Sequence, residues 1–277
     1  MEAQLTALQL PYRRVPAWTP DDVAHRFSMI NVFSMPGLSS TEMACLASHL
    51  DAIHEAVHDP ASQHIEYALI LEDDVELQMD VDLLSLARSA PPFGILQLFT
   101  SNGEEVSRLW SEYKTMSNDT TIEDKMWKEY SWTSGFWSTQ AYIIHKPTVR
   151  AFIDRVVTRI NLEGNNIKHI QLASPSPPSS PNKYSNPFQV GTRSVMVKFK
   201  CVADSYLYTA MEPTFVTRIP LFNGHEVGRT SRITSDAGKN ARQTTVFQKI
   251  GEVLREAKLE GSSMLPSFIR APQVAVD

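Results

Sequence analysis

The stretch YALILEDD, from Tyr67 to Asp74, sets an apolar run directly against three adjacent carboxylates. An apolar run of this length is typical of a strand buried on both faces of a parallel sheet. Open α/β sheets bind their ligands beyond the carboxyl ends of the strands. Neighbouring carboxylates repel each other, and a divalent cation with oxygen ligands relieves that repulsion. The run therefore predicts either a metal site for a phosphate-bearing substrate or a solvated acidic strand end.

The composition is that of an ordinary globular protein. Of 277 residues, 42% are hydrophobic and 21% are charged, which suits one large domain. A formal net charge of -5 argues against a general nucleic-acid binder. Two cysteines, Cys45 and Cys201, are too few for a disulfide framework, and buried free thiols are expected. There is no apolar stretch long enough for a membrane span and no signal peptide, so we expect a cytoplasmic protein.

Strands and helices alternate along the chain, which predicts an α/β fold. A helix is expected over 41–57, strands over 67–71, 94–100 and 139–145, and a helix over 80–90. Because that last helix connects the first two strands, they form a predicted βαβ unit of parallel strands. We therefore expect residues 1–277 to form a single Rossmann-like domain with a mostly parallel central sheet flanked by helices. The Ser- and Pro-rich span 171–188 is expected to be a flexible loop, and 261–277 a poorly ordered tail.

The three carboxylates do not all face the same way in an extended backbone. Glu72 and Asp74 point to one face, and Asp73 points to the other. Two carboxylates on one face suit Mg²⁺ or Mn²⁺ bridged to a diphosphate. Zinc is disfavoured, because no cluster of Cys and His has ligand spacing.

Two further segments have competing interpretations. Cys45 and His49 lie one turn apart on the expected helix, which allows a nucleophile pair, although a pair without a third orienting group is usually structural. The aromatic-rich run from Trp132 to Gln140 surrounds Gly135. It suits the wall of a sugar site or a packed loop equally well.

The later part of the chain offers four more candidate residues. Asp204 begins a short predicted helix, where it either caps the helix or acts as a general base near the metal. In the glycine-containing loop that follows, His225 is a candidate third metal ligand. Arg229 and Arg232 are candidates for bidentate pairing with a diphosphate. A solvated loop is the alternative for these last three residues.

Three segments together resemble glycosyltransferase family 25, the lipooligosaccharide and collagen galactosyltransferase-like proteins. Residues 42–49 (EMACLASH) resemble that family's Glu-x-Gly-Cys-x-x-Ser-His helix, with Ala44 in place of the glycine. Residues 68–75 (ALILEDDV) resemble its acidic strand end, and residues 135–146 (GFWSTQAYIIHK) resemble a later strand region. The resemblance extends from about residue 12 to residue 236, with Asp204 in a later aspartate position.

The resemblance implies a GT-A-type fold, a Mn²⁺ or Mg²⁺ cofactor, a UDP-sugar donor, a glycan or glycoconjugate acceptor and an inverting reaction. By position, it places Glu72 and Asp74 at the metal and the donor diphosphate, and Asp73 near the nucleotide sugar. The metal would stabilise charge on the leaving diphosphate, and a carboxylate would take the proton from the acceptor hydroxyl. We assign that second role to Asp204.

One departure from the family bears on donor binding. Family members usually open with a Val-Ile-Asn-Leu strand that helps to hold the nucleotide, and no such strand precedes Tyr12 here. Either the form is short, or residues 28–33 take over a sheet position, or donor binding is weakened. Two other functions stay open: a non-catalytic glycan-binding relative, and a metal-dependent phosphohydrolase. The phosphohydrolase lacks a second ligand cluster for a two-metal site.

Overall fold

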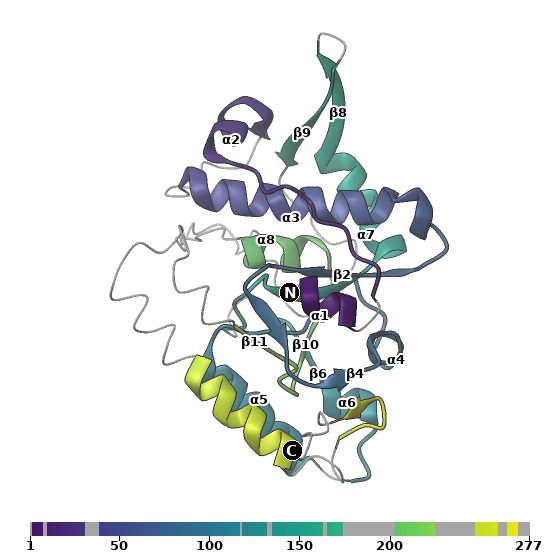
Figure 1. The fold of residues 1–277 in the computed structure, drawn as a ribbon, viewed down its shortest axis with the longest axis vertical. Helices are drawn as coiled ribbons and strands as arrows, with labels where there is room; N and C mark the ends of the chain where they lie inside the picture. Colours follow the sequence, from purple (N-terminus) through teal and green to yellow (C-terminus); the bar gives the residue numbers. More distant parts are fainter. Residues whose placement is uncertain are drawn as a thin grey trace, which may run out of the picture.

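The computed structural model describes residues 2–7, 10–30, 39–116, 118–131, 135–162, 165–173, 203–224, 247–259 and 265–270. A five-stranded sheet lies at its centre, in the order β2-β7-β5-β10-β6 (Figure 1). The strands are β2 (Tyr67–Leu71), β7 (Ala141–His145), β5 (Ile95–Gln97), β10 (Thr214–Thr217) and β6 (Trp127–Glu129).

This sheet is mostly antiparallel, so the prediction of a mostly parallel sheet is wrong. β7 lies between β2 and β5 and is antiparallel to both. Within the described strands of this sheet, β5 and β10 are the parallel pair, and β6 is antiparallel to β10. β2 and β5 do point the same way, as predicted, but they are not neighbours. An apolar run records burial on both faces whatever the direction of its neighbour, which is why the sequence suggested a parallel sheet.

Both faces of the sheet are covered. In β7, Tyr142 and Ile144 belong to one hydrophobic cluster, while Ala141 and Ile143 belong to another. Because successive side chains of a strand point to opposite faces, these two clusters lie on opposite sides of the sheet. The α/β class with helices on both faces is therefore confirmed.

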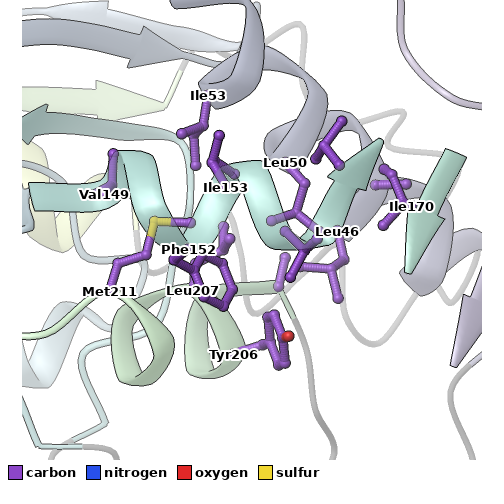
Figure 2. Packing of buried hydrophobic residues seen from close by; sticks show 14 of the residues in the cluster. Leu46, Leu50, Ile53, Val149, Phe152, Ile153, Ile170, Tyr206, Leu207 and Met211 are labelled. Atoms are coloured by element: carbon purple, nitrogen blue, oxygen red, sulfur yellow. The ribbon is translucent and has the colours of Figure 1, made fainter. Parts of the chain in front are cut away.

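The first face is covered by three helices. α3 (Ser40–His58) begins with a capping box, in which Ser39 and Glu42 bond reciprocally. It packs with α7 (Lys146–Val156) and α8 (Ala203–Ala210). Figure 2 shows this packing. The labelled side chains are Leu46, Leu50 and Ile53 from α3, Val149, Phe152 and Ile153 from α7, Tyr206 and Leu207 from α8, with Met211 and Ile170 beside them.

The second face is covered by α5 (Gly103–Thr115) and the helical segment 247–259. Glu104 pairs with Lys249, and Lys114 pairs with Glu256. The ion pairs join the beginnings of the two helices and then their later turns, so the helices lie side by side and run in the same direction. Their apolar residues belong to the second cluster.

A smaller sheet of three strands lies beside α3 and α7, in the order β1 (Phe27–Ile30), β9 (Asn165–Ala173) and β8 (Val157–Leu162). Its β8–β9 hairpin projects past α3 (Figure 1). β1 pairs with β9 and not with the central sheet, so within the described part of 28–33 the chain does not take over a position in the central sheet.

The remaining described elements are short. They are α1 (Glu2–Ala7), α2 (Pro20–Arg26), a 3-10 turn (Pro60–Ser62), β3 (Val75–Leu77), β4 (Asp80–Val81), α4 (Leu83–Arg88), α6 (Ile122–Met126), β11 (Phe222–Gly224) and β12 (Ile269–Arg270).

Two predicted irregular spans fall partly on described residues. Residues 171–173 form the end of β9, and the rest of the expected loop 171–188 lies outside the described residues. Within 261–277, β12 pairs with β4, and only 265–270 are described. Cys45 is a half-buried free thiol, and Cys201 lies outside the described residues. No helix in the described ranges combines the length and apolar character needed to cross a bilayer.

Candidate active site

The three carboxylates lie immediately after β2, in the turn that leads to β3; we call Glu72, Asp73 and Asp74 the acidic turn. The backbone N–H of Glu72 donates to the carbonyl of Gln140 at 2.9 Å, which continues the pairing with the β7 side by one residue. Asp73 and Asp74 already lie in a turn. The alternation expected of an extended strand therefore ends at Glu72. Asp73 is exposed, whereas the other two carboxylates are partly buried.

The segment just before β7 contacts the acidic turn; we call Ser138, Thr139 and Gln140 the STQ segment. Thr139 Oγ1 donates to Glu72 Oε1 at 2.8 Å. Gln140 Nε2 donates to Asp74 Oδ1 at 2.9 Å. The backbone N–H of Ser138 donates to Asp204 Oδ2 at 3.0 Å. Three consecutive residues thus donate to three carboxylates, two from the acidic turn and one, Asp204, from a distant part of the sequence.

Strand pairing explains why these segments meet. Leu71 at the end of β2 lies opposite Ala141 at the start of β7. Because the two strands are antiparallel, the residues after one and before the other emerge at the same edge of the sheet. The strand over 139–145 was predicted, but its antiparallel pairing with β2, which assembles the site, was not.

A buried histidine pairs with the first carboxylate. His49 Nε2 lies 3.2 Å from Glu72 Oε1, and His49 Nδ1 lies 3.2 Å from the Tyr142 hydroxyl. Burial lowers the pKa of His49, but hydrogen bonds to Cys45 and Glu72 and the charge of Glu72 outweigh it and raise that pKa to about 10. Burial likewise raises the pKa of Glu72, but the hydrogen bond and charge of His49, with the Thr139 hydroxyl, lower it overall. The pair is therefore ionised across the neutral range.

Asp74 is in a less favourable environment. Burial raises its pKa, the Gln140 hydrogen bond opposes that shift, and the charges of Glu72 and Asp73 add to it. A divalent cation would remove this penalty, and carboxylate oxygens are the ligands that Mg²⁺ and Mn²⁺ prefer. The donor set of the acidic turn thus fits a hard divalent cation.

Asp204 lies in the first turn of α8, with 7% of its surface exposed. Its Oδ1 accepts from the Ser205 backbone N–H at 2.7 Å, while Oδ2 accepts from Ser138. Burial raises the pKa of Asp204, although these backbone hydrogen bonds oppose the shift. Tyr208, one turn later on α8, donates its hydroxyl hydrogen bond to the Ser138 carbonyl. Asp204 therefore interacts both with its own helix and with the STQ segment.

The STQ segment is held in a strained conformation. Ser138 has a backbone φ of 147°, which side-chain-bearing residues rarely adopt. The buried amide Nε2 of Gln97 donates to the Phe136 carbonyl at 3.0 Å and the Phe99 carbonyl at 2.8 Å, which ties down the chain just before the segment. Such strain costs about 1–3 kcal/mol and is typical of functional sites.

Comparison with protein families identifies the chain. Residues 1–165 match the model of glycosyltransferase family 25, described as an LPS biosynthesis protein. The chain belongs to glycosyltransferase family 25. Searches of curated proteins and of solved structures found no significant match. The family 25 match includes His49, the acidic turn and the STQ segment, and it ends before Asp204.

Not every predicted site residue of this family 25 chain falls on described residues. Glu72, Asp73, Asp74 and Asp204 do, and the STQ segment links three of them. His225, Arg229 and Arg232 lie outside the described residues, so their roles stay predictions. Sequence reasoning missed Thr139 and Gln140 as partners of the carboxylates. Their signal was the polar pair between Gly135 and a buried strand, which gains meaning only once that strand is known to pair with β2.

Two other features of this family 25 member are structural. Ser48 accepts from the Trp18 backbone N–H at 2.9 Å, so it fastens the N-terminal segment to α3. Asp51, His54 and Glu55 bring their ligand atoms within 4.8 Å of one another, as metal ligands do. However, the Lys168 ammonium pairs with both of these carboxylates and Arg13 also pairs with Glu55, so protein cations already neutralise this cluster.

Proposed function

We propose that this family 25 member is a metal-dependent hexosyl- or pentosyltransferase that moves a sugar from a UDP-sugar donor to a hydroxyl group of a glycan or glycoconjugate acceptor, with inversion. The observation that supports this most strongly is the convergence of Glu72, Asp74 and Asp204 on the STQ segment. Membership of a glycosyltransferase family supplies the reaction class. A GT-A-like arrangement, in which the donor lies beyond the end of β2, goes with this proposal.

The cation site is proposed at the acidic turn. Asp74 is partly buried, burial and the adjacent negative charges raise its pKa, and Asp73 is exposed beside it. Mn²⁺ or Mg²⁺ suits these oxygen ligands, with His225 as a proposed further ligand. A cation bound there supplies electrostatic stabilisation to the diphosphate as it leaves.

Asp204 is the proposed general base. It accepts the proton of the acceptor hydroxyl while the hydroxyl oxygen bonds to the anomeric carbon and the bond from that carbon to the diphosphate oxygen breaks. Burial raises its pKa, which makes it a better proton acceptor, and the backbone N–H groups of Ser138 and Ser205 fix its orientation. Arg229 and Arg232 are proposed to pair with the diphosphate oxygens, for which the planar guanidinium is suited.

A donor-hydrolysis screen tests the proposal. A panel of UDP-hexoses and UDP-pentoses is incubated with Mn²⁺, Mg²⁺ or EDTA, and released UDP is measured. We expect one donor to be hydrolysed with metal and not with EDTA, and Asp74→Asn to lower that rate at least about 100-fold. The matched control is Asp80→Asn, which removes an exposed carboxylate of β4 and leaves the rate unchanged.

The same screen separates the other candidate functions. Release of inorganic phosphate in place of UDP indicates a phosphohydrolase. Glycan binding without turnover, unaffected by Asp74→Asn, indicates a non-catalytic relative. No metal-dependent reaction with any donor, in a protein whose folding is confirmed by circular dichroism, contradicts the proposal.

A further inference from the structure

We propose that His49 is a positioning residue that holds Glu72 as a structural anchor of the acidic turn, so that Glu72 is not itself a cation ligand. The statement that Glu72 is not a cation ligand presupposes a cation at the acidic turn, so it rests on the proposed function. The anchor itself rests on contacts within the protein.

The Glu72 side chain is held through one of its two carboxylate oxygens. Its Oε1 accepts from Thr139 Oγ1 at 2.8 Å and lies 3.2 Å from His49 Nε2. A carboxylate oxygen has two lone pairs, so these two partners occupy Oε1 and leave Oε2 as the oxygen that a cation could reach. The backbone N–H of Glu72 is also bonded, to the Gln140 carbonyl. Glu72 is therefore fastened through its backbone and its side chain.

The His49 ring is itself held in place by burial and by contacts at both ring nitrogens. It projects from the buried face of α3, with 6% of its surface exposed. Its other ring nitrogen lies 3.2 Å from the hydroxyl of Tyr142 in β7. Because both ring nitrogens are engaged, the ring orientation is fixed. His49 thus connects α3, the end of β2 and β7 at one point.

The other two carboxylates of the acidic turn, Asp73 and Asp74, have fewer contacts than Glu72. Among the described residues, Asp74 accepts one side-chain hydrogen bond, from Gln140, and Asp73 lies exposed. Glu72 thus has two side-chain partners on one oxygen, which leaves the two aspartates as the less engaged carboxylates of the turn. A cation that used Oε1 of Glu72 would have to displace Thr139 or His49, whereas Asp73 and Asp74 are reached without displacing either.

A double-mutant cycle on stability tests the anchor without any metal. Urea unfolding midpoints are compared for wild type, His49→Gln, Glu72→Gln and the double variant. We expect each single variant to lower the midpoint and the double variant to lower it by clearly less than the sum. The control cycle uses His58 and Asp154, an exposed pair 2.6 Å apart, and is expected to be additive. An additive result at His49 and Glu72 overturns the anchor.

Mn²⁺ binding, measured by calorimetry without donor, tests the division of roles. If His49 positions the turn, His49→Gln, Glu72→Gln and the double variant each weaken Mn²⁺ binding to a similar extent, about tenfold, as loss of supporting residues does. If Glu72 is a ligand, His49→Gln frees its Oε1 for the cation, so Mn²⁺ binds more tightly. Tighter binding therefore overturns the proposal, as does a loss in Glu72→Gln that equals the loss in Asp74→Asn.

Two further arms keep the test decisive. Thr139→Val is nearly isosteric and removes one Glu72 contact while His49 stays in place; we expect it to weaken Mn²⁺ binding in the same direction, and unchanged binding counts against the proposal. If the wild type binds neither Mn²⁺ nor Mg²⁺, the metal dependence of the proposed function fails. The stability cycle alone then decides whether His49 and Glu72 form the anchor.

Discussion

The side-chain amide of Gln140 donates a hydrogen bond to Asp74 Oδ1 over 2.9 Å. Burial raises the pKa of Asp74, and the charges of Glu72 and Asp73 raise it further, so this amide is the side-chain contact that favours the ionised form. A carboxylate must be ionised to bind a cation. Gln140 is therefore coupled to the metal affinity of the acidic turn even though it need not touch the metal.

Replacing Gln140 with leucine tests that coupling. We expect Gln140→Leu to bind Mn²⁺ about tenfold more weakly at pH 6, because the loss of a supporting contact commonly costs this much. The deficit narrows as the pH is raised to 8, because a higher pH favours the ionised form of Asp74 whether or not Gln140 is present. Calorimetry at the two pH values measures both effects. Gln63→Leu, at an exposed position after the 3-10 turn, is the control. Equal Mn²⁺ affinity of Gln140→Leu and wild type at pH 6 contradicts the prediction.

The His49–Glu72 pair makes a second prediction, on the pH dependence of stability. The pKa of His49 is raised to about 10 in the folded protein, so its contribution is complete below its unfolded pKa of 6.5 and is lost as the pH rises through about 10. The pKa of Glu72 is lowered from 4.5, so its contribution is complete above pH 4.5 and is lost as the pH falls through the folded value. The pair therefore stabilises the fold most between these two limits.

Urea unfolding of wild type and His49→Gln at several pH values measures the contribution of the His49–Glu72 pair to stability. We expect the difference in unfolding free energy between wild type and His49→Gln to be largest near pH 5.5 and to shrink between pH 7 and pH 10. One titrating group sets a limit of about 1.4 kcal/mol per pH unit on that change. Thr214→Val, which removes a neutral hydroxyl group that donates to the Tyr208 carbonyl, serves as the control and is expected to differ from wild type by a constant amount. A constant difference for His49→Gln would show that the charge of His49 contributes nothing.

Several elements were predictable because local signals suffice for them. The apolar run predicted β2 at the residues where it lies, and the Ser39–Glu42 capping box fixed the start of α3. The acidic turn was recognisable as a site because folding alone does not favour adjacent carboxylates. Family resemblance rested on the same segments, and the family match confirmed it.

The partners of the carboxylates were not predictable, because they depend on strand order. Nothing in the sequence of β5 or β2 records that β7 lies between them, since all three are buried runs. Without that pairing, Thr139 and Gln140 have no stated neighbour. His49 was interpretable only as one half of a helix-borne pair with Cys45, whereas its contact with Glu72 spans two elements.

Gly94 provides a third prediction, on packing at the start of β5. A Cβ atom there would lie 2.0 Å from the backbone carbonyl oxygen of Met211, so the α8–β10 connection would have to move. We expect Gly94→Ala to lower the unfolding free energy by about 1–3 kcal/mol, as overpacking does. At Gly251, in the helical segment 247–259, the nearest atom is 3.8 Å away. Gly251→Ala should therefore stabilise by up to about 1 kcal/mol. Urea titration of both variants checks the opposite signs.

The ion pairs of Lys168 give a fourth prediction. Its ammonium, on β9, pairs with Asp51 and with Glu55, 2.5 Å away, both on α3. The two carboxylate side chains are only 10% and 11% exposed, so they are poorly solvated when the cation is removed. Trp18 Nε1 donates to Asp51 at 3.1 Å, but one neutral donor does not replace a charge. The charge of Lys168 therefore stabilises the docking of the small sheet on α3.

Lys168→Met keeps the apolar stem and removes the charge. We expect it to lower the unfolding free energy by about 2–3 kcal/mol, because Asp51 loses its cation while Glu55 keeps its ion pair with Arg13 at 2.7 Å. Lys128→Met is the matched control, because Lys128 pairs with Glu112 at 3.4 Å where both side chains are more than 30% exposed. Such a surface pair contributes at most about 1 kcal/mol. Equal losses in the two variants would mean that Lys168 acts as an ordinary surface cation and that the small sheet is held on α3 by its apolar contacts.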